Sequence, residues 1–503
     1  MPQKSFGILR SLVLAALAQS IPGTLFADPM LSSWFTEAST KYARIYTNAA
    51  ARSAGISTTT WSNQSLPTYA GVHEINYSSN WVYIKNTGLA PYVMGPWNNP
   101  NLPKNQGTST GVYRFPRNPS VNTNLATTGR TLTGMGSIGF LVDGVAIYNT
   151  SDGFSYSVSN NKDASPVAGI GPGDGIWNRD AWPNEKVSFD YPLNHPQPSG
   201  QYHAHANPIG VRYVLGDNIN YDSSTKFYSE NTSATNGKHS PIIGWVNDGL
   251  PLYGPYGYSN PTNPTSSVRR MISGYVLRDG NYGTTNLTST GRKSLPLWAQ
   301  QAQNKTNLTT GQWGPNVSTT YELGHYAEDY DYLGDLGYTQ GIHFDLNKYN
   351  ARYCVTPEYP NGTWAYFVSI KADGTSWYPY NVGRWYMASP SGGSSTLTVM
   401  NADINLTNYY SFTNFVETWR ANPLAVSSNK ITLIWNAMEG GVYQIKATND
   451  LNSPTTNWPT IVSSLTATSN VASFDESGSF SSVTRRFYKL VRTGTNSFDS
   501  VGY

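Results

Sequence analysis

Residues 201–218 read QYHAHANPIGVRYVLGDN, and residues 238–259 read KHSPIIGWVNDGLPLYGPYGYS. Three of the seven histidines, His203, His205 and His239, lie between Gln201 and Tyr258. Side chains alternate along a β-strand, so a strand through YHAH places His203 and His205 on one face. Two neighbouring imidazoles are suited to bind a metal ion. We expect His239 to supply a third ligand and Asp248 a carboxylate.

A structural role for these histidines is the alternative, because an imidazole can also hydrogen-bond inside a polar core. The surrounding sequence favours a site. Pro241, Gly244, Gly249, Pro251, Gly254, Pro255 and Gly257 crowd one short run. Rigid, turn-rich segments of this kind often carry functional residues.

A second set of candidates follows in the acidic, tyrosine-rich segment EDYDYLGD, residues 328–335. Carboxylates this close together are costly unless they are paired, bound to a cation or solvated. A solvated loop is the commonest outcome. The alternative is that Glu328 or Asp329 faces the histidines, as perturbed carboxylates do in clefts. His343 could form another same-face pair, with Asp345.

The segment before the histidine pair, residues 160–200, is rich in loops and prolines. Within it His195 lies between prolines, out of register with the expected strand, and is a weak ligand candidate. Four side chains of the same segment could line a pocket beside the histidine pair: Trp177, Asp180, Trp182 and Glu185.

Composition indicates an exported, β-rich protein. Charged residues make up 13% of the 503 residues and the net charge is +3, so the concentrated basic face that nucleic acid requires is not expected. The 36 tyrosines and 15 tryptophans, with abundant Gly, Asn, Ser and Thr, are typical of strands joined by turns. Residues 1–27 have the basic start and short apolar core of a signal peptide, and no apolar run has membrane-spanning length.

Local patterns predict a mainly β protein with a short N-terminal helix. Apolar residues at helical spacing place that helix in residues 28–60. Asp143-Gly144 between two apolar runs predicts a hairpin over residues 138–148. Cys354 is the only cysteine, so an intrachain disulfide is excluded, and a buried apolar role is expected for it.

Several blocks of this sequence match a known family in order. YHAHANPIGVR, HSPIIGWVNDGLPLYGPYGY, EDYDYLGDLG and YNARYCVTPEYPNGTWAYFV resemble the YHYH-domain family of secreted bacterial proteins over about residues 130–390. Ala204 stands where the naming motif has its second tyrosine. Because Ala204 would point away from the two histidines in a strand, metal ligation should survive this departure. The resemblance implies a fold neighbourhood rather than an activity.

The last part of the chain predicts a separate module. Residues 428–503 contain five short strand patterns separated by turns and look like a small β-sandwich similar to fibronectin type III modules. The expected organisation is a signal peptide (1–27), a large irregular YHYH-like β-rich domain (28–390), a Ser/Thr-rich linker (391–427) and this sandwich (428–503).

Three functions follow from these features. The first is a secreted, periplasmic or cell-surface protein that binds copper or zinc through the His-x-His pair, as a metal-dependent oxidoreductase or hydrolase or without catalysis. The second is a carbohydrate-binding or carbohydrate-processing protein, suggested by the aromatic content, with a glycan or other small molecule as its ligand. The third is a non-catalytic surface or adhesion protein whose histidines are structural.

Overall fold

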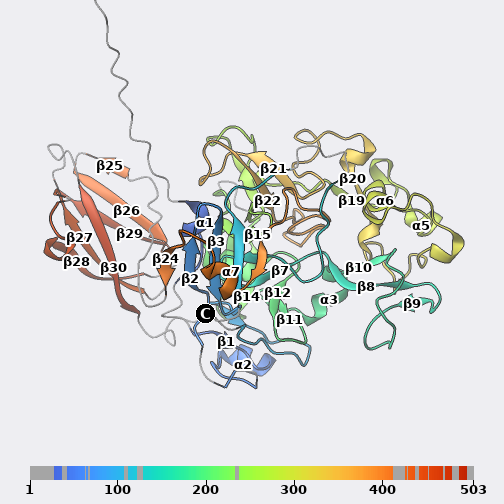
Figure 1. The fold of residues 1–503 in the computed structure, drawn as a ribbon, viewed down its shortest axis with the longest axis horizontal. Helices are drawn as coiled ribbons and strands as arrows, with labels where there is room; N and C mark the ends of the chain where they lie inside the picture. Colours follow the sequence, from blue (N-terminus) through green and yellow to red (C-terminus); the bar gives the residue numbers. More distant parts are fainter. Residues whose placement is uncertain are drawn as a thin grey trace, which may run out of the picture.

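The computed structural model describes thirteen stretches of the chain: residues 28–36, 42–62, 64–65, 68–106, 111–121, 129–232, 237–411, 425–427, 429–436, 441–450, 452–467, 471–478 and 486–495. The expected signal peptide, residues 1–27, lies outside them. The described residues form a mainly β protein, as predicted, in which two large sheets and several two- and three-stranded sheets are joined by turns and short helices (Figure 1).

The larger sheet has eight strands and carries the candidate site at one end. Its order is β11-β12-β7-β6-β15-β16-β22-β21, with parallel pairs at β12–β7 and β16–β22 and antiparallel pairs elsewhere. Every residue of β15 is buried, as expected for a strand covered on both faces. The strands are β6 (Ser137–Leu141), β7 (Ala146–Tyr148), β11 (His195–Pro196), β12 (Tyr202–Ala204), β15 (Ile242–Val246), β16 (Pro251–Tyr253), β21 (Ala351–Cys354) and β22 (Thr363–Phe367).

Two Asp-Gly turns connect neighbouring strands of this sheet. The predicted hairpin at Asp143-Gly144 is confirmed as β6–β7, and Asp248-Gly249 makes the equivalent turn between β15 and β16. In each turn the aspartate Oδ1 accepts the backbone N–H two residues ahead, at 3.1 Å, and the glycine has φ above +80°.

The second sheet is entirely antiparallel, in the order β23-β5-β3-β2-β24. It packs on the first through aromatic rings: Phe140 of β6 lies 3.8 Å from Tyr113 and 6.3 Å from Phe115, both of β5, between ring centroids. The core is therefore shared between the two sheets. The strands are β2 (Val72–Tyr77), β3 (Trp81–Asn86), β5 (Val112–Pro116), β23 (Gly393–Ser395) and β24 (Thr407–Ser411).

The short helical structure expected within residues 28–60 is present as α1 (Pro29–Ser32) and α2 (Ala49–Ala54), on either side of strand β1 (Arg44–Ile45). The expectation for a later connecting segment was wrong. The expected linker, residues 391–427, supplies both edges of the second sheet, β23 and β24, with α7 (Leu397–Asn401) between them. In residues 393–411 the low hydrophobicity reflects edge strands with an exposed side, and residues 412–424 of the expected linker lie outside the described residues.

Smaller elements surround the two sheets. The remaining helices are α3 (Ala181–Glu185), α4 (Ile209–Val214), α5 (Leu287–Thr290) and α6 (Leu297–Gln303), and the three-ten turn η2 (Lys186–Ser188) follows α3. The remaining strands are β4 (Val93–Met94), β8 (Ser151–Ser157), β9 (Lys162–Asp163), β10 (Asn178–Asp180), β13 (Ile219–Asp222), β14 (Phe227–Glu230), β17 (Tyr256–Tyr258), β18 (Val268–Arg270), β19 (Tyr275–Leu277) and β20 (Tyr330–Tyr332).

The C-terminal strands form a small sandwich of two three-stranded sheets, in which the five predicted strands are joined by β25 from the expected linker. The sheets are β25-β26-β29 and β28-β27-β30, and a separate apolar cluster that includes Trp435 and Tyr443 lies between them. Figure 1 shows these strands in orange and red at one end of the molecule. The strands are β25 (Ala425–Ser427), β26 (Lys430–Asn436), β27 (Gly441–Thr448), β28 (Thr460–Thr466), β29 (Val471–Ser477) and β30 (Phe487–Thr495).

Candidate metal centre

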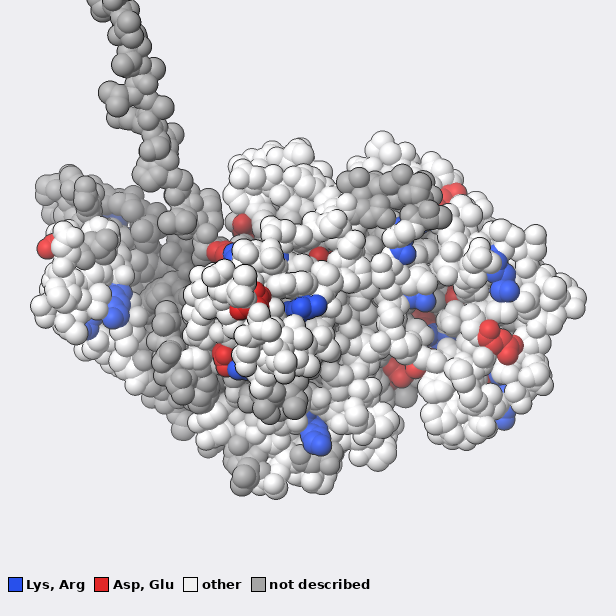
Figure 2. All heavy atoms as spheres, in the orientation of Figure 1, with Lys and Arg blue, Asp and Glu red and all other residues white. Residues whose placement is uncertain are grey.

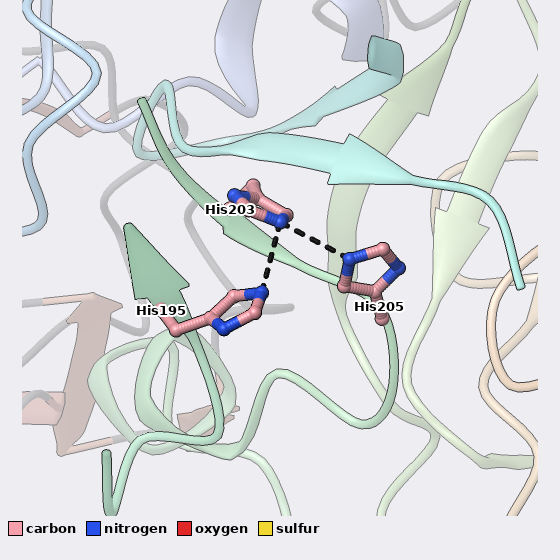
Figure 3. A group of neighbouring side chains, drawn as sticks. All are labelled: His195, His203 and His205. Carbon is pink, nitrogen blue, oxygen red and sulfur yellow. Dashed lines mark hydrogen bonds between the residues drawn. The ribbon is translucent and has the colours of Figure 1, made fainter. Parts of the chain in front are cut away.

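Three histidines meet at the β11–β12 end of the eight-stranded sheet (Figure 3). His203 Nε2 lies 3.0 Å from His195 Nε2 and 3.1 Å from His205 Nε2. All three rings are buried, with between 2% and 6% of each residue exposed. The predicted same-face arrangement of His203 and His205 is confirmed, because their Nε2 atoms point toward one another.

The third member of the cluster, His195, reaches it through a hairpin. His195 pairs directly with His203 and Pro196 with Tyr202, and residues 197–201 form the connecting loop. Gly200 of that loop has φ +87°, which favours glycine. The expectation that His195 would be out of register was wrong. The signal that could have found it is Pro-Ser-Gly, a turn sequence between two histidines that a hairpin places opposite each other.

Hydrogen bonds at Nδ1 fix the tautomer of each ring. His203 Nδ1 faces the Gln201 carbonyl at 3.0 Å, and His205 Nδ1 faces the Asn149 carbonyl at 2.7 Å. A carbonyl oxygen can only accept, so both Nδ1 atoms carry the proton. His195 Nδ1 lies 2.8 Å from Ser188 Oγ, whose own hydrogen is donated to the Glu185 carbonyl. His195 Nδ1 is therefore also the donor.

Consequently three Nε2 lone pairs point at one another. Neutral rings in this tautomer have no hydrogen to place between their Nε2 atoms, so the contacts of 3.0 and 3.1 Å are repulsive rather than bonding. Protonation would relieve the repulsion, but burial opposes it. Burial lowers the pKa of His195 to about 3, that of His205 to about 4, and that of His203 well below the usual range.

A metal ion accepts all three lone pairs at once. Metal–nitrogen bonds of about 2.0–2.1 Å in tetrahedral geometry place neighbouring ligand atoms about 3.3 Å apart, close to the contacts seen here. Outward Nδ1–H bonds to carbonyl or hydroxyl oxygens are also what metal-ligating histidines usually make, since they orient the ring and raise its basicity. The His195, His203 and His205 cluster is thus close enough to hold a metal ion.

Glu185, at the end of α3, adds a carboxylate to the cluster. Its Oε2 lies 3.3 Å from His205 Nε2 and 3.6 Å from His195 Nε2. Oε2 is buried and has no hydrogen-bond partner among the described residues, and burial raises the pKa of Glu185 to about 8. The predicted proximity of Glu185 to the histidine pair is confirmed.

Aromatic rings hold the histidines in place. Tyr148 stacks on His203 with ring centroids 4.0 Å apart, and Phe189 meets His195 edge-on at 4.4 Å. Of the other predicted pocket residues, Trp182 packs on Phe189, one layer away from the histidines. Asp180 instead begins helix α3, where it accepts the Trp182 N–H.

Two of the predicted ligands lie outside the cluster. His239 Nδ1 bonds to the Ser240 carbonyl, and its ring packs against Tyr253 and Tyr258. Asp248 forms the β15–β16 turn and also accepts the Tyr366 hydroxyl at 2.6 Å. Its carboxylate is occupied by the turn and the core, which explains the Asp-Gly pattern without a metal.

The second set of candidates is also placed elsewhere. Glu328 is buried and accepts two hydrogen bonds from Asn178, at 2.7 Å each. Asp329 forms a buried bidentate ion pair with Arg292, through two hydrogen bonds of 2.7 Å. His343 is exposed, with Nδ1 near Thr339. The acidic run is therefore mainly buried and internally paired, neither solvated nor facing the histidines. Trp177, expected in the pocket, is buried and donates to the Gln312 carbonyl.

The chain belongs to the YHYH protein family, which it matches over residues 112–378. All three histidines and Glu185 lie inside the matched region. Comparisons with curated proteins and with solved structures found no match. Among the helices of the described residues, none has the length and apolar character that crossing a membrane requires.

Proposed function

We propose that this protein is exported and binds a transition-metal ion through His195, His203 and His205. One observation supports this most directly: all three Nδ1 atoms donate outward, so three Nε2 lone pairs converge with no hydrogen between them. A purely structural cluster would be expected to orient at least one Nε2–H toward a neighbouring lone pair. Here the carbonyls of Gln201 and Asn149 prevent that arrangement for His203 and His205.

The donor set suits zinc or copper. Imidazole nitrogens suit both metals, whereas calcium and magnesium take oxygen ligands. Three histidines with one open position form a common catalytic zinc arrangement, in which the bound water loses a proton readily. Glu185 is placed to act either as the fourth ligand or as the base that accepts the proton of such a water.

Metal analysis of protein purified without a His tag tests this proposal. We expect close to one equivalent of zinc or copper per protein by inductively coupled plasma mass spectrometry. If the metal is copper, we also expect a Cu(II) signal in electron paramagnetic resonance. The His203→Ala/His205→Ala double variant should lose the metal. His343→Ala is the matched control, because this histidine is exposed and lies outside the cluster.

A further variant tests whether Glu185 is a metal ligand. Glu185→Gln should lower metal affinity strongly if the carboxylate is a ligand, and should leave metal content unchanged if a water takes that position. Equal metal content in the parent and the double histidine variant would contradict the proposal itself. Folding of each variant is checked by near-ultraviolet circular dichroism.

Export and the role of the C-terminal sandwich are part of the same proposal. The basic and apolar pattern of residues 1–27 supports export, and N-terminal sequencing of the secreted protein tests it. The strand pattern of residues 428–503 supports a fibronectin-type-III-like attachment or spacing module. Charged side chains are sparse and dispersed on the face shown in Figure 2, in keeping with a small-molecule or glycan partner rather than nucleic acid.

A further inference from the structure

A cavity of about 520 Å³ lies beside the candidate metal centre. This volume is within the range of roughly 300–1,000 Å³ that small-molecule sites take. Asn149 connects the cavity to the metal centre, because it lines the cavity and its backbone carbonyl accepts the hydrogen bond from His205 Nδ1. The cavity lies on the Nδ1 side of His205, so it is a separate site from the one that the Nε2 atoms define.

Arg384 brings a positive charge to this cavity. The guanidinium lines the cavity, and its Nη1 donates to the Thr133 carbonyl, which is the one side-chain hydrogen bond that Arg384 makes within the described residues. No carboxylate of those residues lies within ion-pair distance of it. Burial lowers the pKa of Arg384, and the charges of Tyr378 and Glu328 offset this effect only in part.

Two fully buried arginines of the described residues pair closely with carboxylates. Arg212 Nε lies 2.6 Å from Asp217, and Arg292 Nε lies 2.7 Å from Asp329. Buried charges are expected to have such partners, because desolvation without pairing is costly. Arg384 is only partly buried and has no carboxylate that close, so its guanidinium is available to pair with an anion that enters the cavity.

The rest of the lining limits the charge of that anion. Glu328 and Asp174 also line the cavity. Glu328 is held by Asn178 and by Gln303, which donates at 3.0 Å. One guanidinium and two carboxylates disfavour phosphate esters and polycarboxylates, which carry several negative charges. Hydrogen-bond donors on the ligand would in contrast be favoured near the two carboxylates.

We propose that this cavity binds a small organic acid whose single carboxylate pairs with Arg384 and whose hydroxyl or ammonium groups face Glu328 and Asp174. Uronic acids and α-amino acids share this chemistry. A guanidinium binds a carboxylate through two parallel hydrogen bonds, which gives both orientation and affinity. The site does not depend on the metal, and it would give this exported protein a ligand whichever metal it carries.

Isothermal titration calorimetry on the full-length, metal-loaded protein tests the proposal. The acidic probes are D-galacturonate and D-glucuronate for the first source, and L-alanine and L-serine for the second. D-Galactose and D-glucose are the matched neutral probes for the uronic acids. We expect at least one of the four acids to bind. Where a uronic acid binds, its neutral sugar should be weaker by about tenfold or more, as the loss of a charge-assisted hydrogen bond predicts.

Two variants locate the binding. Arg384→Gln keeps a donor for the Thr133 carbonyl but removes the charge, and should weaken the acid by about tenfold or more. Gly134→Leu leaves Arg384 in place and extends a side chain from the cavity wall, where a Cβ would meet no atom within 4 Å. If Arg384→Gln does not fold, Gly134→Leu decides the question, because it should abolish binding.

Metal content should be the same in both variants as in the parent, which separates this proposal from that of the metal centre. Binding of a uronic acid alone or of an amino acid alone identifies the source and supports the shared chemistry. Three results would overturn the proposal. The first is that none of the four acids binds at 10 mM, a concentration that would detect dissociation constants of about 1 mM. The others are that a neutral sugar binds as tightly as its acid, or that Gly134→Leu leaves binding unchanged.

Discussion

Replacing His203 tests the metal centre most sharply, because this residue connects the other two. His203 Nε2 lies 3.0 Å from His195 Nε2 and 3.1 Å from His205 Nε2. In His203→Ala the remaining two nitrogens lose the ligand that both adjoin. We expect the parent to be stabilised by added zinc or copper and His203→Ala to show no such stabilisation.

The size of the effect follows from linkage. A metal at a hundred times its dissociation constant stabilises the folded state by about 2.7 kcal/mol. The part of the chain that contains the site, 28–411, has roughly 380 residues, and an unfolding entropy of about 2.1 cal/mol/K per residue gives about 0.8 kcal/mol/K. The melting temperature should therefore rise by about 3 °C with metal.

Differential scanning calorimetry with metal and with chelator measures this shift. His343→Ala, with an exposed ring outside the cluster, should keep the full shift of the parent. Equal metal-dependent shifts in the parent and His203→Ala would refute the reasoning, because the lone pairs at the cluster would then not hold the ion. The absence of a shift in the parent under saturating zinc and copper would refute it as well.

Three further outcomes are expected. Ser188→Ala removes the hydroxyl that orients His195, and should weaken metal affinity by roughly 10–100-fold in a chelator competition. Asp329→Asn leaves the Arg292 charge buried without its partner, and should lower the free energy of unfolding by about 3–5 kcal/mol in urea. Burial raises the pKa of Asp143 to about 7, so the folded state retains a proton that the unfolded state loses near pH 4. The contribution of Asp143 to stability should therefore fall as pH rises from about 4 to 7. Asp143→Asn should remove this pH dependence.

Each of these outcomes can fail in its own way. Unchanged affinity in Ser188→Ala would mean that His195 is oriented by its packing on Phe189 alone. A small effect of Asp329→Asn would show that water reaches Arg292. For Asp143, urea unfolding of parent and variant across pH 4–8 should give two curves that separate as pH rises. Parallel curves would show that the aspartate keeps its usual pKa despite burial.

Much of the β architecture could be predicted from local patterns. The Asp143-Gly144 hairpin and the five C-terminal strands were found because turn residues and alternating apolar positions act over a few residues. The linker expected at 391–427 failed for a related reason. Edge strands such as β23 and β24 bury only one side, so their composition resembles that of a loop.

The candidate site was only half visible in the sequence. Strand alternation alone places His203 and His205 on one face, and this was independent of the rest of the chain. His195 and Glu185 join them only through the β11–β12 hairpin and the position of α3. His239 and Asp248 also lie in the motif-rich segment of residues 238–259, but their own turns and hydrogen bonds direct their side chains into the core. Sequence by itself determined the strand pair of histidines, because alternation is a local property; tertiary structure decided which other groups reach them, because convergence depends on how distant strands pack.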